Sequence, residues 1–296
     1  MSGKTGVHLV RGLITAAFLI HLSSAMAIDL APLWDFGKPE VSEQRFRAAL
    51  ATASGDDALI LQTQIARTYG LRADFARAQE LLRSIEPQVR TAGAEARVRH
   101  ALEFGRTLSS AVHPPESQTP EVREQARAAY LGAFELARAE RLDGLAIDAL
   151  HMLAFVDTAP ADQLKWAEQA LAVVEASSQP AAKAWEASLR NNLGYALHQL
   201  GRYDEALAQF EHAVVLSERG QDAEATRIAY WMVAWTLRFL GRANEALEIQ
   251  LRLEREWAEA GTPDPYVFEE LEYLYLARGD ATRAAHYAAK RKALAR

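Results

Sequence analysis

Residues 193–213 read Leu-Gly-Tyr-Ala-Leu-His-Gln-Leu-Gly-Arg-Tyr-Asp-Glu-Ala-Leu-Ala-Gln-Phe-Glu-His-Ala, and this stretch sets the architecture of the chain. Apolar residues recur at helical spacing on both sides of Gly201, which predicts two helices joined by a short turn. A turn this short makes the helices antiparallel neighbours. Gly194 and Ala206 are small where the two helices must approach closely. We expect Phe210 to fill the gap between hairpins and Ala213 to let the next helix pack.

Proline and glycine divide the remainder of the chain into similar segments. Proline interrupts a helix interior but is tolerated in its first turn. The stretches between prolines are rich in Ala, Leu, Glu and Arg, with apolar residues at helical spacing and short joints. We therefore predict an all-α train of helical hairpins, with thirteen helices at 42–54, 57–70, 74–90, 92–112, 119–142, 144–156, 160–177, 180–200, 203–219, 221–240, 243–260, 264–278 and 281–295.

Residues 193–213 resemble the tetratricopeptide repeat, in which Leu-Gly in the first helix is followed by a glycine turn and A-x3-F-x2-A in the second. Residues 240–247 and 277–284 repeat the pattern more faintly. The equivalent second-helix positions are Ala78, Ala126, Gln163, Ala206, Ala246 and Ala284, separated by 48, 37, 43, 40 and 38 residues. The resemblance implies a right-handed solenoid of about six hairpins over 57–296, an N-terminal capping helix at 42–56 and an extension at 28–41.

The first 27 residues have the order of a secretory signal peptide. Lys4 and Arg11 precede an apolar run at 12–22, and the small-residue triplet Ala25-Met26-Ala27 follows it. The run is shorter than the roughly 20 residues that span a bilayer. We expect cleavage after Ala27 and a periplasmic or secreted protein with no membrane span, the alternative being a leader retained as an anchor. The absence of cysteine fits an oxidising compartment.

Composition and motifs exclude several classes of function. The 33 Lys and Arg residues are outnumbered by 39 Asp and Glu, which argues against a nucleic-acid partner. A chain without cysteine has no disulfide, thiolate metal site or thiol nucleophile. No two histidines beyond the leader are four residues apart, and no glycine-rich phosphate loop or G-x-S-x-G motif is present. We predict that the protein is not an enzyme and uses no metal or cofactor.

The resemblance also places a binding surface, because the first helices of such repeats line the concave face of the solenoid. Residues four and seven apart share one helical face. Trp, Tyr and Arg anchor many protein interfaces. We therefore predict a concave aromatic groove that binds a protein or peptide, formed by Asn191, Tyr195, His198, Trp231, Trp235, Arg238, Tyr266, Glu269 and Tyr273.

Alternatives remain open at this stage. Aromatic residues at helical spacing also suit a core, so Trp231 and Trp235 belong either to the groove or to the packing between helices. The same aromatic surface would suit a periplasmic sensor of a small ligand or glycan, since sugars stack on Trp and Tyr. A hydrolase with carboxylates scattered over the solenoid is a third reading. By fold analogy alone, an exported repeat scaffold implies a role in envelope assembly or maintenance.

Overall fold

The computed structural model describes residues 28–294, which form α-helices, two short 3-10 helices and no β-strand. The predicted all-α class is therefore confirmed, whereas the predicted signal peptide lies outside the described residues. Among the described residues, no helix combines the length and hydropathy that a membrane crossing requires. The α-helices are α1 (Pro39–Leu50), α2 (Gly55–Leu71), α3 (Phe75–Val89), α4 (Ala94–Leu108), α5 (Pro120–Ala139), α6 (Asp143–Val156), α7 (Pro160–Ala176), α8 (Pro180–Lys183), α9 (Glu186–Gln199), α10 (Tyr203–Arg219), α11 (Ala223–Phe239), α12 (Ala243–Glu259), α13 (Pro265–Ala277) and α14 (Ala281–Leu294).

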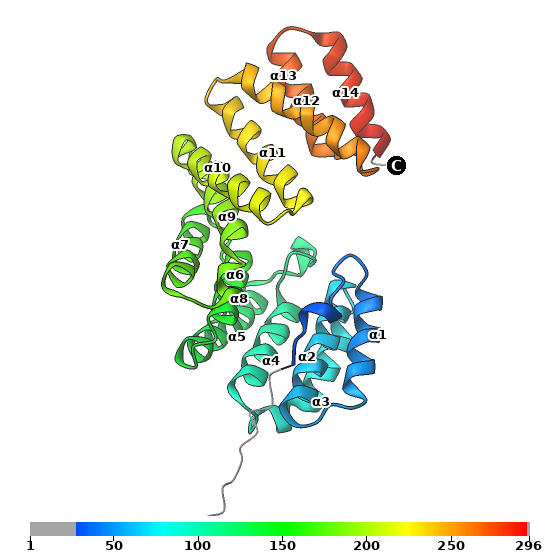
Figure 1. Ribbon diagram of the computed structural model, residues 1–296, viewed down its shortest axis with the longest axis vertical. Coiled ribbons are helices and arrows are strands. Elements are labelled where there is room, and N and C mark those ends of the chain that lie inside the picture. Colours follow the sequence, from blue (N-terminus) through cyan, green and yellow to red (C-terminus); the bar gives the residue numbers. More distant parts are fainter. Residues whose placement is uncertain (1–27, 295–296) are drawn as a thin grey trace, which may run out of the picture.

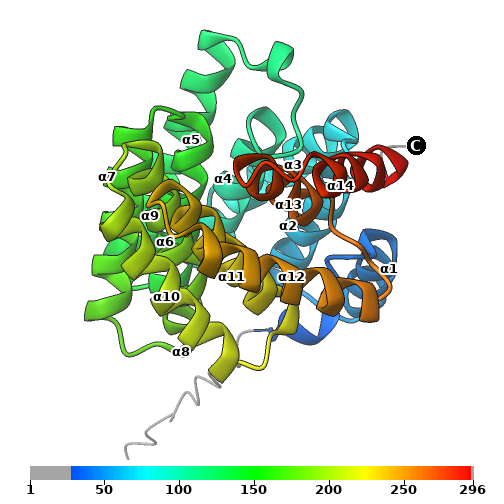
Figure 2. The same cartoon turned by 90° about the horizontal axis from the view of Figure 1, so that it is seen from above.

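The helices form six antiparallel hairpins that follow one another along a curved path, α2–α3, α4–α5, α6–α7, α9–α10, α11–α12 and α13–α14 (Figure 1). Figure 2 shows the same path from above. The first helices of consecutive hairpins contact one another; for example, α2 contacts α4, and α11 contacts α13. Each second helix packs on the first helix of the next hairpin. The first helices therefore form the inner layer of the solenoid, and the predicted arrangement of about six hairpins is confirmed.

The single helix predicted at 180–200 is wrong, because the chain bends at Ala184 and Trp185 and forms α8 and α9 instead. The short α8 packs on the start of α6, where Gly144 leaves room for Ala181. Lys183 Nζ also donates a hydrogen bond of 2.6 Å to the carbonyl oxygen of Val174. These tertiary contacts hold α8 away from the axis of α9, and local sequence does not reveal them.

The repeat register predicted for the second helices is confirmed at five of its six positions. Five alanines, at 78, 126, 206, 246 and 284, are buried at the contact between the helices of a hairpin. Gln163 in α7 is only half-buried, and its amide donates to the carbonyl oxygen of Ala154 at the end of α6. In this third hairpin a hydrogen bond to the preceding helix replaces the close contact that alanine allows elsewhere.

Gly194 and Phe210 form the close contact at the centre of the fourth hairpin. A Cβ atom at Gly194 would lie 2.6 Å from the nearest atom of the Phe210 ring, and that ring is fully buried. Phe210 therefore packs against the first helix of its own hairpin. Gly105 in α4 and Tyr130 in α5 have the same relation, also with a distance of 2.6 Å. Tyr130 follows Ala126 by four residues as Phe210 follows Ala206, so hairpin α4–α5 repeats the same contact, although its sequence carries no full motif.

Residues 28–38 pack against the first hairpin and α1. Leu30 is buried and Trp34 is partly buried in the N-terminal part of the core. The Trp34 indole N–H donates a hydrogen bond of 3.3 Å to Gln64 of α2, and its ring meets the edge of Phe46 in α1. The predicted extension is therefore an ordered strap across α2, and α1 begins at Pro39 because proline is accommodated in a first turn.

Candidate binding groove on the inner helices

Exposed apolar side chains gather on the inner helices. Of the thirteen large hydrophobic residues exposed in the described part of the chain, eight lie on first helices and two on second helices. An apolar surface that is concentrated on one layer indicates an interaction site. The eight residues are Leu71, Phe155, Tyr195, Ile228, Phe239, Tyr266, Tyr273 and Leu276.

The centre of this surface is a continuous row of rings across α9, α11 and α13. Trp235 lies at its middle, with ring-centroid distances of 3.4 Å to His198 and 6.0 Å to Tyr195. Trp231 stacks on Trp235 at 5.6 Å and meets Tyr266 of α13 edge-on at 6.2 Å. These five residues therefore lie side by side, and we call them the aromatic row.

Trp231 and Trp235 belong neither wholly to the surface nor wholly to the core. Both side chains are partly buried and pack against the main core, yet both stack in the exposed row. The indole Nε1 of Trp231 is buried and has no hydrogen-bond partner among the described residues. These tryptophans therefore form the more buried part of the aromatic row, while Tyr195 and Tyr266 stand at its surface with 42% and 63% exposure.

The remaining predicted residues have other roles. Arg238 is held by Glu270 through two hydrogen bonds of 2.7 Å, so its charge is already compensated. Its guanidinium also lies over the ring of Tyr273. Glu269 pairs with Arg291 at 2.6 Å. Asn191 lies in a separate hollow between α9 and α11 and not in the aromatic row.

His198 is the most strongly perturbed group of the aromatic row. Its ring is buried under Trp235, and Nε2 has no hydrogen-bond partner among the described residues. Burial, assisted by the nearby charge of Arg238, lowers the pKa of His198 to about 4. The imidazole is therefore neutral at ordinary pH and acts as an aromatic ring.

We expect His198 to make the protein less stable in mild acid. The unfolded chain binds a proton near pH 6.5 and the folded chain only near pH 4, so stability is lost as pH falls through this window. In urea unfolding at pH 7 and pH 4.5, His198→Phe should reduce the acid-induced loss by about 2 kcal/mol. The exposed His212 provides the control, and His212→Phe should leave the loss unchanged. Equal losses in wild type and His198→Phe would contradict the burial of a neutral imidazole.

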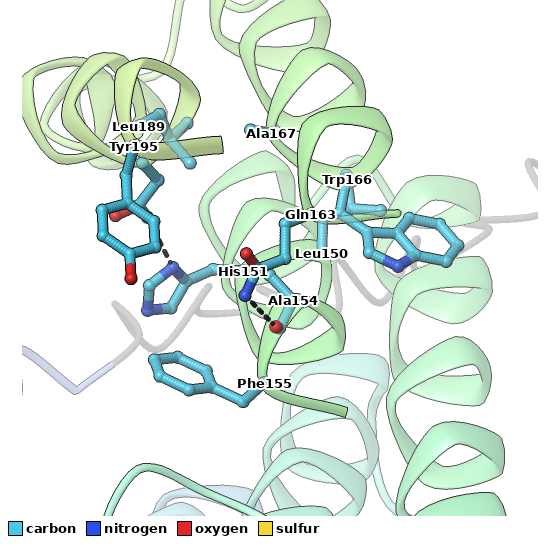
Figure 3. Close-up of a pocket in the computed structure, with 10 residues that line it drawn as sticks. Leu150, His151, Ala154, Phe155, Gln163, Trp166, Ala167, Leu189 and Tyr195 are labelled. Atoms are coloured by element: carbon cyan, nitrogen blue, oxygen red, sulfur yellow. Dashed lines mark hydrogen bonds between the residues drawn. The ribbon is translucent and has the colours of Figure 1, made fainter. Parts of the chain in front are cut away.

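A pocket of about 170 Å³ continues the groove from Tyr195 toward α6 (Figure 3). One side of the pocket is formed by His151 and Phe155, and apolar side chains form most of the rest. Asn192 Nδ2 lies 3.1 Å from His151 Nδ1, within hydrogen-bond distance. We call this cavity the α6 pocket. Of its residues the sequence analysis identified only Tyr195, although His151 and Phe155 are four apart on a first helix, the spacing that indicated the aromatic row. The lining residues are Leu150, His151, Ala154, Phe155, Gln163, Trp166, Ala167, Leu189, Asn192 and Tyr195.

A second pocket of about 200 Å³ lies beyond His151 and Phe155, between α2, α4 and α6. It adjoins a buried charge cluster that the sequence analysis did not identify, Arg67, Glu103, Arg106 and Asp148. Arg106 donates a hydrogen bond of 2.6 Å to Glu103 and a second hydrogen bond to Asp148. Burial alone would lower the pKa of Arg106, but Asp148 and Glu103 raise it above its ordinary value. Burial opposes ionisation of Asp148 too, yet Arg106 holds its pKa below the usual range.

The described residues contain no cluster of three or more His, Asp or Glu side chains that could hold a metal ion. What the inner face offers is stacking area, two adjoining pockets and a few fixed polar groups. That arrangement suits binding of a ligand by contact area and shape.

Comparison with known proteins agrees with this architecture. Residues 185–254, which span α9 to α12, match the family model described as Tetratricopeptide repeat. This segment therefore consists of tetratricopeptide repeats. No curated protein sequence matches the chain.

Solved structures with low sequence identity share the tetratricopeptide fold. A signal transduction ATPase with a tetratricopeptide repeat sensor from Pyrococcus horikoshii has 13% identity and a TM-score of 0.65, covering 86% of this chain and 39% of that one. The chain thus spans well under half of that protein. A Rap protein complexed with competence and sporulation factor has 16% identity and a TM-score of 0.55, covering 86% and 70%. A tetratricopeptide repeat protein from Parabacteroides merdae has 16% identity and a TM-score of 0.50, covering 89% and 90%.

Proposed function

We propose that this tetratricopeptide protein is an exported, non-catalytic scaffold that binds a segment of another protein along its concave groove. The observation that carries the proposal is the aromatic row, in which stacked rings of α9, α11 and α13 remain partly exposed on the inner face. Aromatic side chains supply large contact area at low entropy cost, and they dominate the binding energy of many interfaces.

The length of the surface favours a protein segment over a sugar. The aromatic row continues through the α6 pocket to the second pocket, so the surface crosses α13, α11, α9, α6 and α2. A glycan stacks on one or two rings in one pocket, whereas an extended chain spans several helices. The Rap protein in complex with competence and sporulation factor is one tetratricopeptide-like structure with a bound partner.

Export rests on the leader alone. The positively charged start, the short apolar run and Ala25-Met26-Ala27 support secretion with removal of residues 1–27. An exported scaffold of this kind would act in envelope assembly or maintenance. N-terminal sequencing of protein from the periplasmic fraction should begin at Ile28, and full-length protein in the cytoplasmic fraction would contradict export.

The absence of cysteine permits a direct test of the groove, because a single introduced cysteine is the only thiol in the chain. Tyr195→Cys and Tyr273→Cys place a thiol-reactive benzophenone on the inner face, and Val215→Cys places it on α10 with a similar exposure of 41%. After irradiation in an envelope extract, we expect the same protein adduct at Tyr195→Cys and Tyr273→Cys and none at Val215→Cys.

Either of two outcomes would contradict the proposal. One is adducts at all three positions, which would show that contact is unspecific. The other is a protease-resistant adduct at a single inner position, which would indicate a glycan or another small ligand. Tyrosine is preferred to tryptophan here because Trp231 and Trp235 also support the core, and their replacement would mix loss of binding with loss of stability.

A further inference from the structure

Arg67 is a cation of the inner face whose hydrogen-bonding capacity is unused. Its side chain retains 25% exposure and lines the second pocket. The ion pair with Glu103 is long, 3.8 Å, because Glu103 already accepts a hydrogen bond of 2.6 Å from Arg106. Arg67 donates no hydrogen bond to any side chain or carbonyl of the described residues. A guanidinium has five N–H donors in a fixed plane, so this site lacks an acceptor.

The strap at residues 28–38 holds the Arg67 guanidinium in position. The rings of Trp34 and Phe36 stack on each other at 4.5 Å, and the guanidinium carbon lies 5.4 Å from each ring centroid. A cation–π contact supplies no hydrogen-bond acceptor, so the N–H donors of the guanidinium remain available. The cation is therefore fixed by one element of the fold while its donors remain open to a ligand.

The second pocket has the chemistry of a side-chain subsite. Leu71, Val112 and Phe155 supply apolar walls, and the charged groups of the lining are Arg67, Glu103 and Arg106, of which Arg67 has no hydrogen-bond acceptor among the described residues. His151 and Phe155 also line the α6 pocket, so one bound segment can fill both. The α6 pocket, with about 170 Å³, is comparable with an engineered cavity of ~150 Å³ that binds benzene, and so it suits a Leu, Met or Phe side chain.

We propose that the groove selects a segment in which an acidic side chain, bound by Arg67 in the second pocket, lies close in sequence to a large apolar side chain that fills the α6 pocket. This inference rests on the proposed function and adds a partner chemistry to it. An Asp or Glu side chain fits because its methylene groups contact the apolar walls and its carboxylate accepts two N–H bonds from one guanidinium.

The charges around Arg67 allow a third carboxylate to bind. Arg106 lies between Glu103 and Asp148 and bonds one oxygen of each, while Glu103 Oε2 has no hydrogen-bond partner among the described residues. Arg67 then balances the remaining negative charge of that group at a distance. A ligand carboxylate in direct contact with Arg67 is nearer to this cation than to either buried acid, and the net interaction is attractive because Coulomb energy falls with distance.

Phage-displayed random 12-residue peptides provide the test, because their C-terminus is fused to the coat protein and offers no free carboxylate. Selection uses wild type, Arg67→Gln, Tyr195→Ala and, as a matched control, Arg138→Gln, an arginine on α5 with its own partner Glu135. We expect peptides selected on wild type to be enriched in Asp or Glu beside a large apolar residue. Arg67→Gln should abolish the acidic preference and keep the apolar one, and Arg138→Gln should keep both.

A second measurement avoids any effect of Arg67→Gln on folding. The best peptide is synthesised with blocked termini, and replacing its acidic residue by the corresponding amide should weaken binding to wild type at least tenfold. Selection that depends on Tyr195 but shows no acidic preference would overturn this inference and leave the proposed function standing. Binding only after the blocked C-terminus is freed would assign the site to a terminal carboxylate and also overturn it. Selection unaffected by Tyr195→Ala would contradict the groove itself.

Discussion

Replacing Arg106 with leucine should lower the free energy of unfolding by about 3–5 kcal/mol, the largest single effect that we expect. Arg106 is the shared partner of Glu103 and Asp148, which are 2% and 6% exposed. Its removal leaves two carboxylates buried at the junction of α4 and α6, and Arg67 lies 3.8 Å from only one of them. An unpaired charge in a dry site costs several kcal/mol, far more than the pair itself contributes when intact.

Urea unfolding at pH 7 measures this effect against Arg138→Leu, which breaks the exposed pair with Glu135. The control should cost less than about 1 kcal/mol because water screens exposed charges. Combining Arg106→Leu with Glu103→Gln and Asp148→Asn removes the stranded charges and should recover a large part of the loss. If Arg106→Leu is no more costly than Arg138→Leu, the cluster is solvated and its description as a buried charge cluster is wrong.

The fold was predictable because each hairpin is specified locally. Gly201 and Gly241 adopt φ of +74° and +76° in equivalent turns, a conformation that glycine reaches without strain. Asp74 and Asp222 accept hydrogen bonds from backbone N–H groups in the first turns of α3 and α11. Signals of this kind lie within a few residues of the boundary that they set, so a single sequence contains them.

The aromatic row was predictable for a similar reason. Trp231 and Trp235 are four residues apart on one helix, and the repeat register places Tyr195 and His198 at matching positions on the preceding first helix. Once the register is known, the shared face follows from helical geometry. The burial of Trp231 and Trp235 does not follow from helical geometry, because it depends on how closely neighbouring hairpins approach each other.

The buried charge cluster could not be predicted as a whole, because only Glu103 and Arg106 are close in sequence and the solenoid brings Arg67 and Asp148 to them. Arg106 and Asp148 are 42 residues apart, and Arg238 and Glu270 are 32 apart. In sequence, each of these charged residues looks like a member of an exposed i,i+4 pair on a helix surface, such as Arg90 with Glu86. Only the packing of first helices against one another distinguishes a buried pair from a solvated one.

The second large effect that we expect is a loss of about 3 kcal/mol in the free energy of unfolding on Gly194→Ala. The new methyl group would lie 2.6 Å from the ring of Phe210, which is fully buried, so the ring or a helix must shift. Alanine favours the helix by about 1 kcal/mol over glycine, so the observed loss is the steric cost reduced by that gain. Gly132→Ala, in α5 with no atom within 4 Å of the new Cβ, should instead stabilise the protein by about 1 kcal/mol.

A double-mutant cycle identifies the cause, because a smaller side chain at 210 gives the methyl group room. Phe210→Leu alone creates a cavity and is destabilising, but Gly194→Ala should add little to it, so the two changes should be strongly non-additive. Gly105→Ala tests whether hairpin α4–α5 is a true copy of the repeat, since its Cβ would meet the Tyr130 ring at the same 2.6 Å. If Gly194→Ala and Gly105→Ala shift the urea midpoint in the same direction as Gly132→Ala, close helix approach at these glycines is not what holds the hairpins together.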